Sequence, residues 1–196
     1  MIRTLLGGLL CLSLSMAAEP NQLSEAESRQ GWKLLFDGKS LKGWDVYKEG
    51  DWIVKDGALA CQGTKPSWIG TQGTFSNYTL ELEFRGSATV NSGVFLRSAK
   101  EGEPHVTGYE LQIWDYQPAG FNTGSLVEYA KAPPVKIRAD QWNHYQVLAD
   151  GDHFVITFNG KTLLDTKNNR HSSGVIGFQC QKGNPIEFRN IKVRAK

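Results

Sequence analysis

The chain has 196 residues, and its 22 Lys and Arg residues against 20 Asp and Glu residues give a net charge of +2. This length suits one domain, and a chain that is 40% hydrophobic and 21% charged has a globular rather than a disordered composition. Nearly balanced, interspersed charges argue against a nucleic-acid partner. The 21 Gly residues indicate many turns, and six Trp residues suit either a β core or a surface that stacks on sugar rings.

The first residues resemble an export signal. Residues 1–3 form a short basic start, residues 5–14 are apolar, and small residues follow at 15–18. We predict a signal peptide over 1–17, cleaved after Ala17 or Ala18, and an extracytoplasmic protein, periplasmic or secreted. Lipidation at Cys11 is the disfavoured alternative, because Leu10 stands where a small residue is expected. The apolar run is about ten residues against roughly 20 for a membrane span, and no later segment is longer, so we expect no stable membrane insertion.

Cleavage would leave two cysteines, Cys61 and Cys180. In an exported chain they can form one disulfide, and the alternative is a pair of buried thiols. Both end predicted strands, over 58–61 and 175–180, so they can meet if those strands are neighbours. A C-x-x-C metal or redox motif is absent.

Residues 18–30 predict one short helix. Ser24 and Glu27 have the spacing of a capping box, and Gly31 stands where such a helix would end. From Trp32 onward the hydrophobic period changes to two, which is typical of strands. Gly, Asn or Asp interrupts this pattern every 6–12 residues.

The remainder, 31–196, reads as about a dozen short strands. Three dipeptides of hairpin type separate some of them, Asp37-Gly38, Asp56-Gly57 and Asn159-Gly160. We therefore predict an all-β fold, a jelly-roll β-sandwich of two antiparallel sheets, with a short N-terminal helix. Trp44 and Trp142 start strands and are predicted to fill the core. The longest irregular stretches, 115–123 and 130–140, are candidates for functional loops.

Several kinds of chemistry leave no trace in the sequence. It has no G-x-S-x-G, H-E-x-x-H, Walker or G-x-G-x-x-G motif. The four His residues are scattered, with no two at a spacing that would share a metal on one strand. A metal site assembled from separate strands stays an open alternative.

The segment 108–115 contains the largest group of candidate functional side chains. In a strand, Glu110, Gln112 and Trp114 would project to one face, and apolar residues to the other. A bulge at the strand end could add Asp115 to the same face. A carboxylate, an amide and an indole in a row suit a sugar site. The alternative is an ordinary solvent-facing strand.

Two flanking segments strengthen the sugar-site interpretation. In 91–97, Phe95 and Arg97 would share one face, and 124–129 carries a second carboxylate at Glu128. If the three strands are neighbours, Arg97, Glu128, Glu110 and Gln112 gather on one concave sheet. An arginine there would bind or polarise an oxygen.

These segments and others, taken in order, resemble the 3-keto-disaccharide hydrolase domain family. The matching stretches are 35–44, 56–59, 91–97, 108–113 with Asp115, 123–126, 141–145, 174–179 and 187–191. The resemblance covers residues 31 to 194. It implies a concanavalin A-like sandwich, secretion, and cleavage of 3-keto-glycosides by hydrolysis or by elimination followed by hydration. The tract 110–115 also looks like the carboxylate-rich strand of laminarinase-type glucanases, but Gln112 and Asp115 depart from that pattern and argue against ordinary retaining chemistry.

A keto-sugar mechanism suggests a role for each residue. Glu110 would be the base, Arg97 or a bound divalent metal ion would stabilise the enolate, and Asp115 or Glu128 would assist the leaving group. The expected substrate-binding residues are Gln112, Trp114, Asn91 and Phe95. The expected partner is a small neutral carbohydrate, with no certain cofactor. The alternatives are a non-catalytic carbohydrate-binding module and a laminin-G-like interaction domain.

Overall fold

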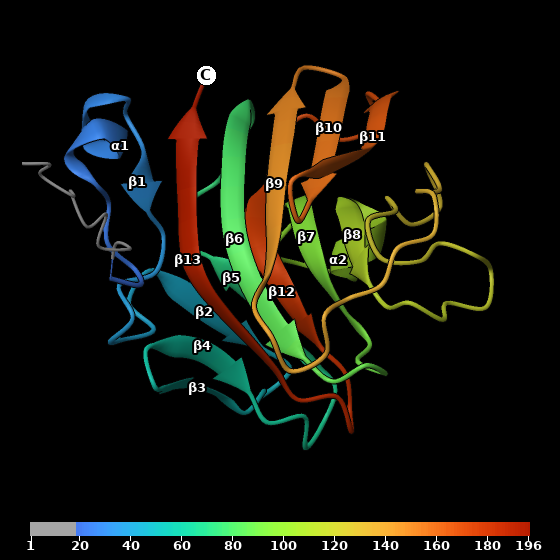
Figure 1. Ribbon diagram of the computed structural model, residues 1–196, viewed down its shortest axis with the longest axis horizontal. Helices are drawn as coiled ribbons and strands as arrows, with labels where there is room; N and C mark the ends of the chain where they lie inside the picture. The colour runs from blue at the N-terminus through green and yellow to red at the C-terminus, as the bar shows by residue number, and fades with distance from the viewer. Residues whose placement is uncertain (1–18) are drawn as a thin grey trace, which may run out of the picture.

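A computed structural model describes residues 19–196, so the predicted signal peptide and Cys11 lie outside the described residues. The described chain consists mainly of strands in two layers (Figure 1), which confirms the predicted all-β sandwich. The helices are α1 (Glu25–Arg29) and α2 (Pro104–Thr107). Neither helix of this part of the chain is long and apolar enough to cross a membrane.

The strands are β1 (Lys33–Leu34), β2 (Trp44–Tyr47), β3 (Trp52–Lys55), β4 (Ala58–Cys61), β5 (Ser67–Thr71), β6 (Tyr78–Gly86), β7 (Ser92–Ser98), β8 (Tyr109–Ile113), β9 (Asn143–Asp150), β10 (His153–Phe158), β11 (Lys161–Lys167), β12 (Val175–Cys180) and β13 (Ile186–Ala195).

Two antiparallel sheets make up the sandwich. The larger has eight strands, in the order β11-β10-β9-β6-β13-β4-β3, with β1 added to β13. The smaller has five, in the order β2-β5-β12-β7-β8. In Figure 1 the smaller sheet lies behind β13, β6 and β9. Strands far apart in sequence are therefore neighbours, as β5 and β12 are.

The core lies between the sheets and follows from the period of two. On β6, Leu80, Leu82 and Phe84 are fully buried, and the residues between them are charged and half-buried. The same alternation runs along β9. Burying one face of each sheet against the other removes these side chains from water, which is the main force that holds the layers together.

The predicted helix and two of the predicted hairpins are present. Ser24 and Glu27 form a complete capping box on α1, and Gly31 has a φ of +83° just beyond it. The dipeptides Asp56-Gly57 and Asn159-Gly160 join paired strands, β3 to β4 and β10 to β11. The prediction for Asp37-Gly38 was wrong, because β1 and β2, on either side of it, belong to different sheets. The Asp37 carboxylate instead accepts the backbone N–H groups of Lys39 and Ser40.

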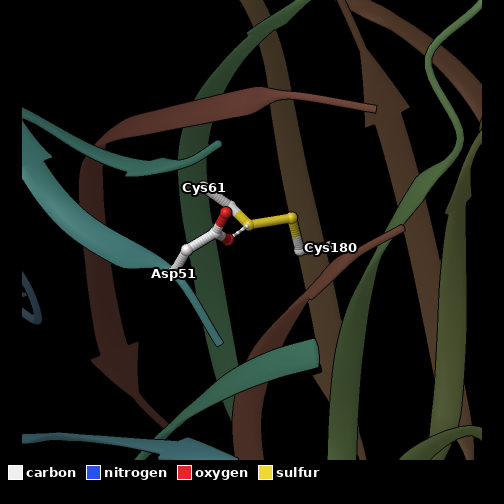
Figure 2. A group of neighbouring side chains, drawn as sticks. All are labelled: Asp51, Cys61 and Cys180. Atoms are coloured by element: carbon white, nitrogen blue, oxygen red, sulfur yellow. Dashed lines mark hydrogen bonds between the residues drawn. A yellow bond between two sulfur atoms is a disulfide. The ribbon is translucent and has the colours of Figure 1, made fainter. Parts of the chain in front are cut away.

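Cys61 and Cys180 form a disulfide, which decides between the two alternatives (Figure 2). Their strands are not neighbours in one sheet. Cys61 ends β4 of the larger sheet and Cys180 ends β12 of the smaller, so the bond joins the two layers across the core. Asp51 lies beside it, with a carboxylate oxygen 2.9 Å from the Cys61 sulfur.

The two tryptophans predicted to fill the core differ. Trp44 is buried in the core, as expected. Trp142 is only partly buried, and the guanidinium groups of Arg85 and Arg189 lie 4.6 and 4.1 Å from its ring centre. The prediction for Trp142 was wrong, because it precedes β9 and packs against side chains that leave the sheet on its outer face.

Candidate functional site

The site is built on the face of the five-stranded sheet that points away from the core, here called the outer face. One row across its five strands consists of Asp45, Gly70, Gly177, Phe95 and Glu110. Two of these positions are glycines, so the middle of the row offers no side chains. The room that the missing side chains leave above β5 and β12 is filled by the indole of Trp68.

The next row along the strands carries the other polar and aromatic groups. Tyr47, Trp68 and Gln179 are paired on three strands, and Gly93 faces Gln112 on the remaining two. The sequence places Trp68 and Gln179 more than a hundred residues apart. Only the strand order β5-β12-β7-β8 brings them to the predicted site strands.

The aromatic side chains of the outer face form their own small cluster. Tyr47 and Trp68 stack with ring centres 3.9 Å apart, and Trp68 meets Phe95 edge to face at 5.8 Å. The indole leans over the bare glycines: a Cβ at Gly70 would lie 2.7 Å from the Trp68 ring. Larger residues at these glycines would displace the indole. Trp68 therefore belongs to the protein's own aromatic packing, since only 3% of its surface is exposed. Sequence reasoning missed its place on this face because its strand gave no signal of which side faces the core.

A hollow of about 110 Å³ lies beside this cluster, under α2. Trp68, Phe95, Gln179 and His105 contribute to its lining. An exposed ion pair between Lys48 and Glu103, with a nitrogen–oxygen distance of 2.7 Å, ties the α2 segment to the end of β2. The hollow therefore has an aromatic wall, a polar floor and a cover from another part of the chain.

Glu110 is the buried carboxyl group of the outer face, with 7% of its surface exposed. Its pKa is raised from 4.5 to about 7, mainly by burial, with a hydrogen bond from Gln179 partly opposing the rise and the Glu128 charge adding to it. The carboxyl group lies directly above Gly93, where an added Cβ would be 2.5 Å from Oε1. A carboxyl group whose pKa lies near neutral can both accept and return a proton.

Gln112 and Glu128 are the other predicted residues that the structure brings to Glu110. Gln112 is buried, and its amide oxygen accepts the N–H of Ile113 at 3.1 Å, which orients the amide. Glu128 is exposed, on a turn rather than the expected strand. That turn still bonds to β8: the N–H of Val127 donates to the Glu110 carbonyl at 2.9 Å. The second carboxylate is therefore held next to the first.

Arg97 does not join this group, contrary to expectation. Its φ is +54°, and the pairing of β12 with β7 shifts between Val175 and Gly177, so the alternation that predicted a face shared with Phe95 is broken. The guanidinium is buried on the core side, 5.0 Å from the Phe154 ring centre. It donates to the carbonyls of Ser76, Gly151 and His171 at 2.8–3.1 Å. These bonds give Arg97 a scaffold role, tying three loops together.

Asp115 is also placed elsewhere, because β8 ends at Ile113 without the expected bulge. One carboxylate oxygen accepts the Thr123 hydroxyl at 2.7 Å, and the other accepts the N–H of Ile137 at 3.1 Å. Burial raises the pKa of the core residue Tyr145 and the Asp115 charge adds to this rise, so Asp115 lies near the core residues. Asp115 therefore fixes the two long loops that follow β8.

The remaining predicted residues lie around the edges. Phe95 is buried in the aromatic cluster, next to Glu110 in register. Trp114 follows β8 and is partly exposed. Asn91 precedes β7, and its backbone N–H donates to the Asn184 side chain at 2.8 Å. Phe95 thus meets the expectation of contact with the site, while Trp114 and Asn91 border it.

Among residues 19–196, the group with the spacing of metal ligands is Asp51, Cys61 and Cys180. Since both sulfurs are held in the disulfide (Figure 2), neither is available as a thiolate ligand. This group does not fit a metal ion. It gives no support to the divalent ion that the sequence left open as an alternative.

The contact between Gly93 and Glu110 predicts the effect of a single methyl group. Gly93→Ala should move the Glu110 carboxyl group and lower kcat/KM by about 10–100-fold while the fold persists, because misplacement by about 1 Å costs this much. The measurement is kcat/KM with a 3-keto-glucoside, the substrate that the sequence resemblance leads us to expect, beside a thermal melt. Gly73→Ala is the matched control, since a Cβ there meets nothing within 4 Å. Equal activities of the two variants would contradict the placement of Glu110.

Residues 31–194 match the model of a family described as the 3-keto-alpha-glucoside-1,2-lyase-like domain. The chain belongs to this family. The match covers the whole sandwich and leaves out the helix α1 segment. It confirms the resemblance seen in the sequence, and together with the relatives below it indicates a sugar-acting domain.

One curated protein and two solved structures are similar to this chain. A 3-keto-disaccharide hydrolase of Bacteroides thetaiotaomicron is 31% identical over 91 residues, 40% of this chain and 31% of that protein, so the match spans under a third of its length. A crystal structure from Parabacteroides distasonis, provisionally named a glycosyl hydrolase, superposes with a TM-score of 0.80 at 23% identity, over 91% of this chain and 100% of that one. The carbohydrate binding module CBM66 of Bacillus subtilis has a TM-score of 0.62 at 17% identity, over 78% and 96%. The two structures support the fold.

Proposed function

We propose that the chain is an exported carbohydrate-active enzyme that cleaves 3-keto-glycosides on the outer face of the five-stranded sheet. The observation that carries the proposal is Glu110, a buried carboxyl group with a pKa of about 7, which is hydrogen-bonded to Gln179 and paired in register with Phe95. Such a group is matched to proton transfer at neutral pH. The family to which the chain belongs supports the substrate class.

The first step is removal of a proton. A ketone at C3 of the sugar acidifies the hydrogen on C2, and the Glu110 carboxylate takes it. The electron pair moves to the ketone oxygen and gives an enolate. Gln179, which hydrogen-bonds Glu110, and Gln112, two residues along the same face of β8, would supply amide N–H groups to stabilise this oxygen.

The second step is loss of the aglycone. The enolate re-forms the ketone, a C1–C2 double bond appears, and the bond from C1 to the glycosidic oxygen breaks. The departing oxygen takes the proton that Glu110 now holds, which returns the carboxylate. Water then adds at C1, C2 regains a proton, and the sum is hydrolysis of one glycosidic bond.

The other residues would serve this sequence in different ways. Glu128 adds a small part to the burial-driven rise in the pKa of Glu110 and, being exposed, would orient the incoming water. The partly exposed Trp114 would pack against the sugar ring, while Trp68 and Phe95, which are 3% and 1% exposed, would support the sheet beneath it. Arg97 and Asp115 act through the scaffold, since their polar atoms are bonded to loop backbone and to Thr123.

The deciding experiment is incubation of the mature protein with a 3-keto-glucoside that carries a chromogenic aglycone, with and without chelator. Aglycone release that Glu110→Gln abolishes is the expected result. Absence of release under both conditions would refute the enzyme proposal, and sugar binding without release would favour a binding module. Release that a chelator stops would add a divalent ion as the stabiliser of the enolate.

A further inference from the structure

A second hollow lies on the opposite side of the sandwich from Glu110. Its volume is about 530 Å³, within the range of roughly 300–1,000 Å³ for pockets that hold small molecules. It opens on the outer face of the eight-stranded sheet. Its lining includes Ile53, Lys55, Ala60, Arg85, Glu187 and Asp140.

The sequence creates this hollow by placing a small residue within a row of long ones. Ile53, Ala60, Glu187 and Arg85 are paired in register across β3, β4, β13 and β6. The flanking residues of β4 point into the core, so Ala60 points outward, and its single methyl group forms the floor. The longer side chains on either side of Ala60 form the walls.

The walls carry donors and acceptors side by side. Arg85 Nε donates to Glu187 Oε2 at 2.6 Å, and Arg85 Nη2 lies 2.5 Å from the same oxygen. This pair uses one carboxylate oxygen and leaves the other, together with further guanidinium N–H groups, for a ligand. A sugar hydroxyl both donates and accepts, so two adjacent hydroxyls match such a pair.

The charges and the apolar surface narrow the ligand class. Lys55 and Arg85 are balanced by Asp140 and Glu187, so the lining has no net charge to attract an ion. Ile53 adds an apolar side, which suits the C–H face of a pyranose ring. A small neutral polyhydroxylated ligand fits this combination better than an anion or a cation.

Stacking on Trp142 holds the polar wall in place. The guanidinium carbon of Arg85 lies 4.6 Å from the Trp142 ring centre, and that of Arg189 lies 4.1 Å from it. Arg189 is itself paired with Glu83 at 2.7 Å. Trp142 and Glu187 already hold Arg85 in place. The Arg85 side chain therefore loses little conformational entropy when a ligand binds.

We propose that this hollow is a second, non-catalytic binding site for a neutral pyranose unit. The choice of a sugar as the ligand class rests on the proposed function, whereas the position of the site does not. Since the two sites lie on opposite faces of the sandwich, this one would hold the protein on a glycan while Glu110 acts on a separate unit. It would thereby raise the local concentration of substrate.

The test is an NMR titration of the full mature protein with methyl α-glucopyranoside, and with glucuronate as an anionic comparison. The expected result is a shift of the Ala60 and Glu187 amides by the neutral sugar, with a Kd of about 1 mM or weaker, and no comparable shift by glucuronate. The shifts should persist in Glu110→Gln. Ala60→Trp, which fills the hollow, and Arg85→Met, which removes the donors, should each weaken binding at these amides at least tenfold.

Both variants should leave kcat/KM for a small soluble 3-keto-glucoside unchanged, because neither residue lies on the catalytic face. Thr162→Trp, on the exposed β11 of the same sheet, is the matched control and should keep the shifts. Absence of shifts at these amides in a folded wild-type protein, or equal shifts with glucuronate, would overturn the proposal. Failure of the proposed function appears instead as absent aglycone release, so the two failures are distinguishable.

Discussion

Glu110→Gln should lower kcat/KM with a 3-keto-glucoside by about 10³-fold, since positioned general bases contribute roughly 10²–10⁴-fold. Glu110 is buried, with 7% of its surface exposed. The substitution keeps the size of this residue and removes only its ability to take a proton. Steady-state rates on the purified mature protein give the measurement. Retention of more than about a tenth of the activity would remove Glu110 from the role of base.

The pH dependence of the wild type follows from the same group. Only the carboxylate form accepts a proton, so kcat/KM should rise with pH and level off above the pKa of about 7. Glu128→Gln should move this profile to lower pH, because the Glu128 charge is one cause of the raised pKa. The move should be small, since burial is the larger cause. A wild-type kcat/KM that does not rise with pH would mean that a group other than Glu110 controls the rate.

The wild type and Glu110→Gln should differ in stability, in a direction set by the pKa of Glu110. The folded carboxyl group has a pKa of about 7 against about 4.5 when unfolded, so the fold favours the neutral form. Wild-type stability should therefore fall as the pH rises from about 4.5 to 7, with the full loss above 7, and the total is at most about 3 kcal/mol. Glu110→Gln should be the more stable protein at pH 8 and show no such loss, which denaturant melts at several pH values would measure.

Local patterns predicted the parts of the fold that depend on neighbouring residues. The capping box of Ser24 and the turn at Asn159-Gly160 involve groups a few residues apart, and both are present. The position of Glu110 on a face away from the core also followed from alternation along one strand. These features need no knowledge of which strands pair.

The rest of the site depends on long-range pairing that one sequence does not reveal. Arg97 lies in a bulge of β7 itself, because two residues of β7 stand opposite one residue of β12 between the pairs Gly177–Phe95 and Val175–Ser98. The bulge becomes visible only once the pairing of β7 with β12 is known. Trp68 and Gln179 reach Glu110 only because β5, β12 and β7 are adjacent. A period of two tells which residues share a face, but it does not tell which strands share a sheet or where a bulge reverses the pattern.

Replacing both Cys61 and Cys180 with Ala should cost about 5 kcal/mol of unfolding free energy, because the disulfide closes a loop with a sequence separation of 119. For a protein of this size that is a drop in Tm of roughly 10–20 °C, which calorimetry would measure. The wild type treated with a reductant should melt close to the double variant, and untreated wild type is the reference. A drop of less than about 3 °C would mean that the bond adds little to what the core already supplies.

The same double substitution should also change the pKa of Glu110 on the outer face, because Cys180 is next to Gln179 on β12. The hydrogen bond of Gln179 opposes the rise in the pKa of Glu110. When the bond between the sheets is gone, β12 is held less firmly, and this hydrogen bond should weaken. The pH at which kcat/KM reaches half its plateau should therefore move upward in the Cys61→Ala, Cys180→Ala protein, measured below its lowered Tm. A profile that stays in place while the Tm falls would show that the disulfide stabilises the sandwich without adjusting its site.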